Sequence, residues 1–430
     1  MKKHLFMLSL LMSLSMFSCT SNGDVDNDIN DIIDNKPDST AQEWEVVTTT
    51  YKEWAQNNSL QPWFDYLEMN KKVDLFSERL TDEVGKLHGN EGFVMSPLSV
   101  ATQLAIIANS SDSSARKEIL EAFDFNSTDE FNDICGSLLW HLDYWFKDYS
   151  QIVNNHIWVS NNCTPGNDYL KKMAQCFNVG VEKIDFSDPS TVSTINDWMS
   201  RYSQGMITDY VTNEMFNGQN HLMASAYYLN VTSPRAQGTS YQIEQDVFHS
   251  PDGDVMVDMI KKLNYAYACG ASNEVADMIS FFIGPSIWLS VYVPKSNIEA
   301  KDLTTIINRD VRRELQDKSQ EVDWTVKMPL FDCTSKLNLI PVLETLGIKT
   351  LNNLDLSPAG IVDSETRVFH QGRAEFKADD FRLTTMTTNY DESVQLVINR
   401  PFIFTVGTLS GTYSNLRSTI MTGVIVNPTK

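Results

Sequence analysis

The order of helical and strand-like patterns constrains the fold of this chain more than any single motif does. Helical patterns occupy much of the chain up to about residue 207, and long strand-like patterns dominate from there to the C-terminus. The two kinds of pattern do not alternate regularly, which argues against repeated βαβ units and a purely parallel sheet. We therefore expect an α+β fold with large mixed β-sheets and a surrounding set of helices.

One helix is predicted from its capping residues. Ser96 is a favourable N-cap, and Pro97 at the first helical position already has a helical φ. The residues that follow are apolar nearly all round, so this helix should be buried. Further helices are expected over 110–125, over 193–207 with an end around Gly205, and over 337–348, where Pro341 interrupts or begins the helix. Strands are expected over 92–95, 153–160, 221–231, 277–284, 287–294 and 324–331, with three more strands in 395–428.

The N-terminus predicts export. Lys2 and Lys3 precede an apolar run that is too short for a resident membrane helix, as in a secretory signal. The run ends at Ser18 and Cys19, which resemble the lipobox of bacterial lipoproteins. That resemblance implies cleavage before Cys19 and lipidation of its thiol. The alternative is an ordinary signal peptide with a chance cysteine.

The region behind the signal divides into a tether and a domain. Residues 19–42 are rich in Asp and Asn and poor in large apolar side chains, so they should form a solvated tether. An acidic stretch just after a lipidated Cys resembles the surface-export signal of some Gram-negative lipoproteins, which implies an outer-membrane anchor and the cell surface. We expect residues 1–18 to be the signal, 43–70 an N-terminal extension and 71–430 the domain.

Composition and motifs exclude several classes of function. The net charge of −22 argues against nucleic acid as a partner. Five of the six Cys remain after Cys19 and none has CxxC spacing, so no metal site is expected; one or two disulfides, or buried free thiols, are both compatible. The seven His are scattered, and no HExxH, GxSxG or P-loop motif occurs. We expect a protein that is not an enzyme and needs no cofactor.

The stretch FRLTTMTTNYDES, residues 381–393, has an unusual pattern for a connecting segment. Phe381, Leu383 and Thr385 alternate with Arg382 and Thr384, which is the period of a half-buried strand. The stretch is rich in β-prone residues rather than in the Gly and Ser of a passive linker. Either this segment is a strand, or it is a loop that can become one.

Five blocks of sequence, in the expected order, resemble the serpin family. LVINRPFIFTV at 396–406 fits the family signature, including Asn399, Arg400, Pro401 and Phe402. MSPLSVATQLAIIA at 95–108, INDWMSRYSQGMI at 195–207, WTVKMPLF with LIPVLETLGI at 324–348, and IMTGVIVNP at 420–428 resemble other family blocks. The resemblance covers the chain from about residue 70 and implies a serpin-like fold with an exposed reactive-centre loop.

The resemblance also implies roles for particular residues. In inhibitory serpins a protease cleaves the reactive-centre loop, whose freed part inserts into the main sheet and drags the acylated protease with it. A buried polar cluster beneath the sheet, called the shutter, would contain Ser96, Ser99, Ser225 and His370. The loop would contain Asp379, Asp380, Phe381, Arg382, Leu383, Thr384, Thr385 and Tyr390, with the scissile bond near Tyr390.

The loop departs from the inhibitory pattern. Ala378, Asp380 and Phe381 stand where the family has a hinge glutamate, a glycine and a small hydroxyl residue. Asp adopts positive φ less easily than Gly, and an unpaired Asp380 in a sheet would lose solvation. Counting forward from His370 puts the scissile position at Val394, not Tyr390, so the loop is about four residues short. At about 3.3 Å per strand residue, the protease would travel about 13 Å less.

Two functions remain open at this stage. The first is an exported, lipid-anchored inhibitor of serine or cysteine endopeptidases, monomeric, with an unidentified target protease as its partner. The second is a non-inhibitory serpin-fold binding protein, which the hinge residues and the short loop favour. Both predict the same fold, so the two differ only in what the loop does after cleavage.

Overall fold

The computed structural model describes residues 63–146, 151–216, 218–229, 241–262, 268–284, 287–295, 298–322, 324–362, 368–376, 396–409 and 417–429. These residues belong to the unit Glu43–Lys430. Cys19, Ala378 and the reactive-centre loop residues from Asp379 to Tyr390 lie outside the described residues, as do the predicted signal and tether. The helices are α4 Trp63–His88, α5 Pro97–Ser110, α6 Ser113–Phe123, α7 Thr128–Phe146, α8 Asn167–Phe177, α9 Ser190–Tyr202, α10 Leu303–Ile306, α11 Arg309–Lys318 and α12 Ile340–Thr345.

Four groups of strands make up the sheets. A seven-stranded sheet has the order β1-β16-β15-β9-β8-β7-β10, and a four-stranded sheet has the order β14-β11-β6-β5. Smaller groups have the orders β3-β2-β4 and β12-β13. The strands are β1 Phe93–Met95, β2 Gln151–Ser160, β3 Val179–Ile184, β4 His221–Leu229, β5 Tyr241–Ser250, β6 Gly253–Lys262, β7 Ala268–Ser272, β8 Ala276–Gly284, β9 Ile287–Pro294, β10 Gln320–Glu321, β11 Val326–Pro329, β12 Phe331–Asn338, β13 Phe369–Phe376, β14 Leu396–Val397, β15 Phe402–Leu409 and β16 Arg417–Ile425.

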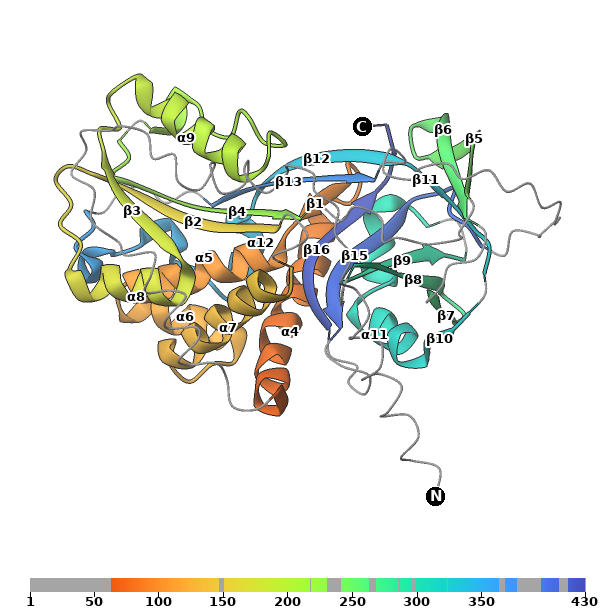
Figure 1. Cartoon of the computed structure of the whole chain (residues 1–430), viewed down its shortest axis with the longest axis horizontal. Coiled ribbons are helices and arrows are strands. Elements are labelled where there is room, and N and C mark those ends of the chain that lie inside the picture. Colours follow the sequence, from red (N-terminus) through yellow and green to blue (C-terminus); the bar gives the residue numbers. More distant parts are fainter. Residues whose placement is uncertain are drawn as a thin grey trace, which may run out of the picture. The chain divides into compact units, whose positions relative to one another are not determined.

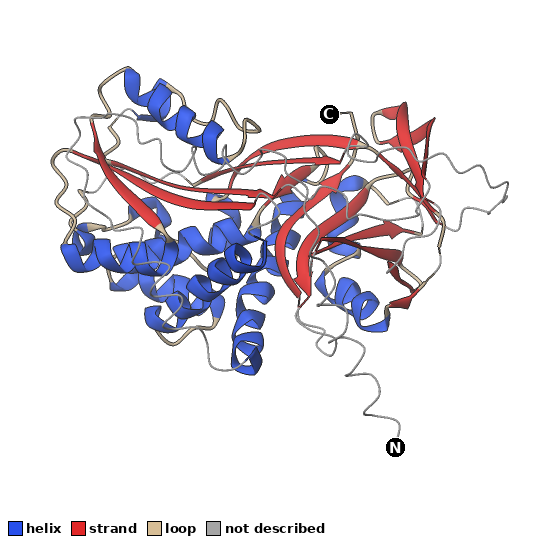
Figure 2. Ribbon diagram, viewed as in Figure 1, coloured by secondary structure: helices blue, strands red, loops and turns tan. Residues whose placement is uncertain are grey.

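The predicted α+β class is confirmed, with both parallel and antiparallel pairings. β2 pairs with β3 in parallel and with β4 antiparallel. Figure 1 shows α9 on one face of the β3-β2-β4 group and α5, α6, α7 and α8 on the other. Helices and strands therefore form separate layers, as Figure 2 shows by colour.

Helix α5 anchors the core because its sequence is apolar on nearly every side. The side chain of Ser96 accepts a hydrogen bond from the backbone N–H of Ser99, so the predicted N-cap is confirmed. Leu104, Ala105 and Ile106 are all at most 1% exposed, which agrees with the predicted burial of this helix. Because α5 is apolar on nearly every side, it packs beneath the strands, and its few polar residues contact them there.

Two predicted boundaries differ from the structure. The strand expected over 324–331 is two strands, β11 and β12, which meet at Leu330. The backbone N–H of Leu330 still bonds the carbonyl of Asp258 on β6, in register with the β11–β6 pairing, and from Phe331 onward the chain pairs with β13 instead. The helix expected to end around Gly205 ends at Tyr202, and Gly205 follows with φ +77°, a left-handed conformation that favours glycine.

The cysteines that follow Cys19 are free thiols. Of the two alternatives, disulfides or buried free thiols, the structure has free thiols, and Cys135, Cys163, Cys176 and Cys333 are buried. Burial raises the pKa of the Cys333 thiol to about 11, so it stays protonated and unreactive. Among the described residues no group of His, Cys, Asp and Glu could hold a metal ion, and no helix is long and apolar enough to cross a bilayer.

Candidate functional site

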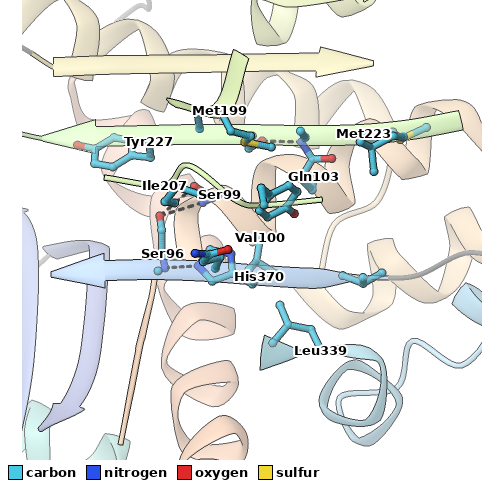
Figure 3. Close-up of a pocket in the computed structure, with 18 of the residues that line it drawn as sticks. Ser96, Ser99, Val100, Gln103, Met199, Ile207, Met223, Tyr227, Leu339 and His370 are labelled. Atoms are coloured by element: carbon cyan, nitrogen blue, oxygen red, sulfur yellow. Dashed lines mark hydrogen bonds between the residues drawn. The ribbon is translucent and has the colours of Figure 1, made fainter. Parts of the chain in front are cut away.

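The candidate site is the gap between strands β4 and β13. β4 is the last strand of its three-stranded group, and β13 is the last strand of its pair with β12. Neither strand has a ladder partner on its free edge among the described residues. Residues of both strands line one cavity of about 150 Å³, together with residues of α5 and of the segment that follows α9. Figure 3 shows the strand that carries Tyr227 on one side of the cavity and the strand that carries His370 on the other.

The cap of α5 joins a polar cluster at the edge of this gap. The backbone N–H of Ser96 donates to Nε2 of His370 at 3.0 Å, and the hydroxyl of Ser96 donates to the carbonyl of Ile420 at 2.8 Å. The hydroxyl of Ser99 donates to that of Ser96 at 3.1 Å. Ser96, Ser99 and His370 therefore lie together, joining α5 to β13 and β16.

The remaining residue of the predicted shutter belongs to a neighbouring network. The hydroxyl of Ser225 accepts from the side-chain amide of Gln103 and donates to the amide oxygen of Asn155. Asn155 in turn donates to the carbonyl of Phe177 at 2.7 Å. Ser225 lines the same cavity as His370 but no hydrogen bond between them is present. The predicted single cluster is thus two clusters, one on each side of the gap.

His370 is held in its neutral form. Desolvation by the surrounding protein lowers the pKa of its imidazole from 6.5 to about 4. A neutral ring with an unprotonated Nε2 is the form that accepts the Ser96 N–H, so the proton of the ring lies on Nδ1. The site therefore carries no charge from this histidine at neutral pH.

The signature residues lie where the chain re-enters the fold after residues 377–395. The backbone carbonyl of Asn399 accepts from the N–H of His249 at 2.7 Å. Pro401 is buried, and the ring of Phe402 lies edge-on to Phe248 and Phe331 at 6.5 and 6.0 Å. Arg400 is partly buried. These residues fix the start of β15 in the core and do not line the gap.

Several residues of the gap, and Asn155 beside it, were not predicted from the sequence. Gln103 stands in an apolar helical run, and a polar residue in that setting indicates a buried hydrogen-bond partner. Asn155, Tyr227 and Gln371 occur in strand patterns that give no such signal. Their roles follow from the position of the gap, which only the fold reveals.

A strand that paired with the free edges of both β4 and β13 would have about their length. β4 has nine residues and β13 has eight, which corresponds to about 27 Å at 3.3 Å per residue. β13 ends at Phe376 and β14 begins at Leu396, so residues 377–395 connect them. A segment that folds back after β13 would run antiparallel to it, which is the arrangement of a hairpin.

Comparison with known proteins agrees with this architecture. The family model for serpins, described as serine protease inhibitors, matches residues 71–428, and α4 begins upstream of that match, at Trp63. Plasminogen activator inhibitor 1 of Neovison vison is 21% identical over 375 residues, which cover 79% of this chain and 90% of the relative. Antichymotrypsin-2 of Bombyx mori is 22% identical over 349 residues, covering 77% and 92%.

Solved structures show the same fold. Native protease nexin-1 with heparin superposes with a TM-score of 0.70 at 16% identity, covering 84% of this chain and 100% of that chain. The thermophilic serpin tengpin in its native state gives a TM-score of 0.63 at 21% identity, covering 82% and 94%. On the family match and on the fold, this chain belongs to the serpin family.

Proposed function

We propose that this serpin inhibits serine endopeptidases by presenting residues 377–395 as a cleavable reactive-centre loop. Members of the family are generally protease inhibitors rather than enzymes. The observation that carries the proposal is the gap between β4 and β13, two strands that lack ladder partners on their free edges in the described part of the chain. Unpaired backbone groups on a strand edge are satisfied by one more strand.

The loop begins at the border of this gap. Residues 377–395 leave from the end of β13, so the part nearest to β13 reaches the gap first. Cleavage near Tyr390 would free this part from β14, leaving Asp380 to Thr385 able to pair with β13 and β4. The alternation of Phe381 and Leu383 with Arg382 and Thr384 suits a strand whose two faces meet different surroundings.

The first test separates inhibition from simple cleavage. The mature protein is incubated with a panel of serine and cysteine proteases, and products are examined on denaturing gels. A covalent complex that survives SDS, with a cut after Tyr390 by mass spectrometry, is the expected result. Cleavage without complex by every protease in the panel would refute inhibition by trapping.

A second function is favoured by the hinge. Asp380 and Phe381 stand where inhibitory serpins have a glycine and a small hydroxyl residue. The loop is also about four residues shorter than an inhibitor's, which removes about 13 Å of travel at 3.3 Å per residue. If these departures prevent insertion, the protein is a serpin-fold binding module. In that case loop cleavage leaves the melting temperature unchanged, whereas an inserted strand raises it.

We also propose that the protein is exported and held on the outer membrane by lipid on Cys19, facing the cell exterior. The basis is the sequence of residues 1–42 alone. Wild-type cells labelled with radioactive palmitate should yield labelled protein in the membrane fraction, and Cys19→Ala should abolish the label. Unlabelled wild-type protein would contradict the anchor. Protease accessibility on intact cells tests surface exposure separately.

A further inference from the structure

The cavity in the gap is large and mostly apolar. Its volume of about 150 Å³ lies between α5 on one side and the segment after α9 on the other. Val100 and Leu104 of α5 contribute to its lining, as do Met199, Ile207, Met215 and Met223. A cavity of about this volume with an apolar lining holds a benzene-sized molecule in an engineered protein. The space in the gap is thus sufficient for a six-membered ring.

Two buried polar atoms in the lining have no partner. The hydroxyl of Tyr227 on β4 and the amide oxygen Oε1 of Gln371 on β13 make no hydrogen bond within the described structure. Both residues line the cavity. Figure 3 shows the Tyr227 ring beside the space between the two strands. Buried polar atoms of a folded protein are normally paired, so these two indicate a missing partner.

The two atoms have complementary requirements. Burial raises the pKa of the Tyr227 phenol, so its hydroxyl keeps its proton and can donate. Oε1 of Gln371 can only accept. A hydroxyl group on a ligand can meet either need, because it can accept a hydrogen bond from the Tyr227 phenol or donate one to the Gln371 amide oxygen.

The lining disfavours a charged ligand. His370 is neutral, since burial lowers its pKa to about 4. The guanidinium of Arg373 at the border is paired with Asp332 at 2.7 Å and lies 3.6 Å from Glu375. Neither offers an uncompensated charge to an ionic ligand, and burial of an unpaired ion is costly.

We propose that this cavity binds a small neutral molecule with a ring-sized apolar body and one hydroxyl group, of the phenol or benzyl alcohol class. The ring contacts the methionine and aliphatic side chains, and the hydroxyl bonds Tyr227 or Gln371. The bound molecule occupies space that an inserted strand needs. This second consequence, that the ligand opposes loop insertion, rests on the proposed function.

The binding test uses phenol with the mature, uncleaved protein. Phenol should raise the melting temperature in a saturable way, and toluene, which has the ring without the hydroxyl, should bind more weakly. Tyr227→Phe removes one hydroxyl and should weaken phenol binding about tenfold, the effect of roughly one hydrogen bond. Gln371→Met should act in the same direction.

The matched control is Tyr169→Phe. Tyr169 is a partly buried tyrosine whose hydroxyl is paired with that of Ser110 at 2.7 Å, and it does not line the cavity. This variant should bind phenol as the wild type does. Equal phenol affinity in Tyr227→Phe, Gln371→Met and wild type, or no saturable effect in any of them, overturns the proposal.

The regulatory consequence is tested with a protease that forms the SDS-stable complex. Saturating phenol should lower the yield of complex relative to cleaved protein, and Tyr227→Phe should need about tenfold more phenol for the same effect. Unchanged yield in the wild type refutes the regulatory part alone. Saturable binding with no complex under any condition leaves the ligand site established and refutes the proposed function instead.

Discussion

At the scale of single residues, His370 couples the stability of the fold to pH. Its pKa falls from 6.5 to about 4 on folding. Between these values the unfolded chain binds a proton that the folded chain does not. Protonation therefore favours unfolding, and the contribution of His370 to stability is complete above pH 6.5 and is lost as the pH falls toward 4.

The prediction concerns His370→Gln, which removes the titrating group but keeps an acceptor for the Ser96 N–H. Wild type should lose about 3 kcal/mol of unfolding free energy relative to this variant between pH 7 and pH 4, since one pKa unit corresponds to about 1.4 kcal/mol. Urea unfolding at several pH values measures the difference. If the unfolding free energies of the two proteins changed in parallel with pH, the pKa of His370 would not be lowered on folding.

At the scale of elements, a cluster of charged residues fastens α4 to α11 and β16. Arg313 lies 2.8 Å from Glu78 and 3.5 Å from Asp74, and Asp74 also accepts from the N–H and hydroxyl of Thr419. Desolvation raises the pKa of Asp74 to about 6, and desolvation with the nearby Asp74 raises that of Glu78 to about 7. The folded chain thus binds protons that the unfolded chain has released, so these two groups make stability fall as the pH rises from about 4 to 7.

Arg313→Met should show how strongly the desolvation of these two carboxylates destabilises the fold. Without Arg313 the two carboxylates lose their nearest cation, and we expect a loss of about 1–3 kcal/mol at pH 7, reduced because Arg313 is about a third exposed. The loss should be smaller at pH 5, where the carboxyl groups are protonated. The control is Lys117→Met, which breaks an exposed pair with Glu121 and should cost less than about 0.5 kcal/mol. Equal losses in both variants would contradict a buried role for the cluster.

The elements also show what the sequence could predict. Ser96 and Pro97 marked the start of α5 because capping is local. The alternation of Phe331, Cys333 and Leu337 with exposed Asp332 and Thr334 in β12 is equally local, yet the predicted strand stopped at residue 331.

The approach of Ser96 to His370 joins residues 274 positions apart. No periodicity predicts such a contact, so that part of the site came only from the family resemblance.

At the scale of the whole molecule, two groups of strands end at the gap, and under the proposed function residues 377–395 would join them. β3-β2-β4 and β12-β13 stand on either side of the gap, and residues 377–395 leave from β13. Under the proposed function, insertion of this segment adds two ladders of hydrogen bonds and buries apolar side chains. Insertion is opposed at the hinge, because the carboxylate of Asp380 loses solvation there and the ring of Phe381 must be packed among the side chains of the sheet.

The last prediction follows from that balance. Asp380→Gly with Phe381→Thr removes the carboxylate and the bulky ring and supplies a residue that adopts positive φ without strain. This double variant should insert faster after cleavage, so a larger share of the target protease should end in the SDS-stable complex and less in cleaved inhibitor. The control is Glu392→Gly, which also exchanges an acid for glycine but lies after Tyr390, in the part that stays with β14. It should leave the share unchanged. If the double variant traps no more protease than wild type, the hinge residues do not limit insertion, and the short loop becomes the stronger physical limit on trapping.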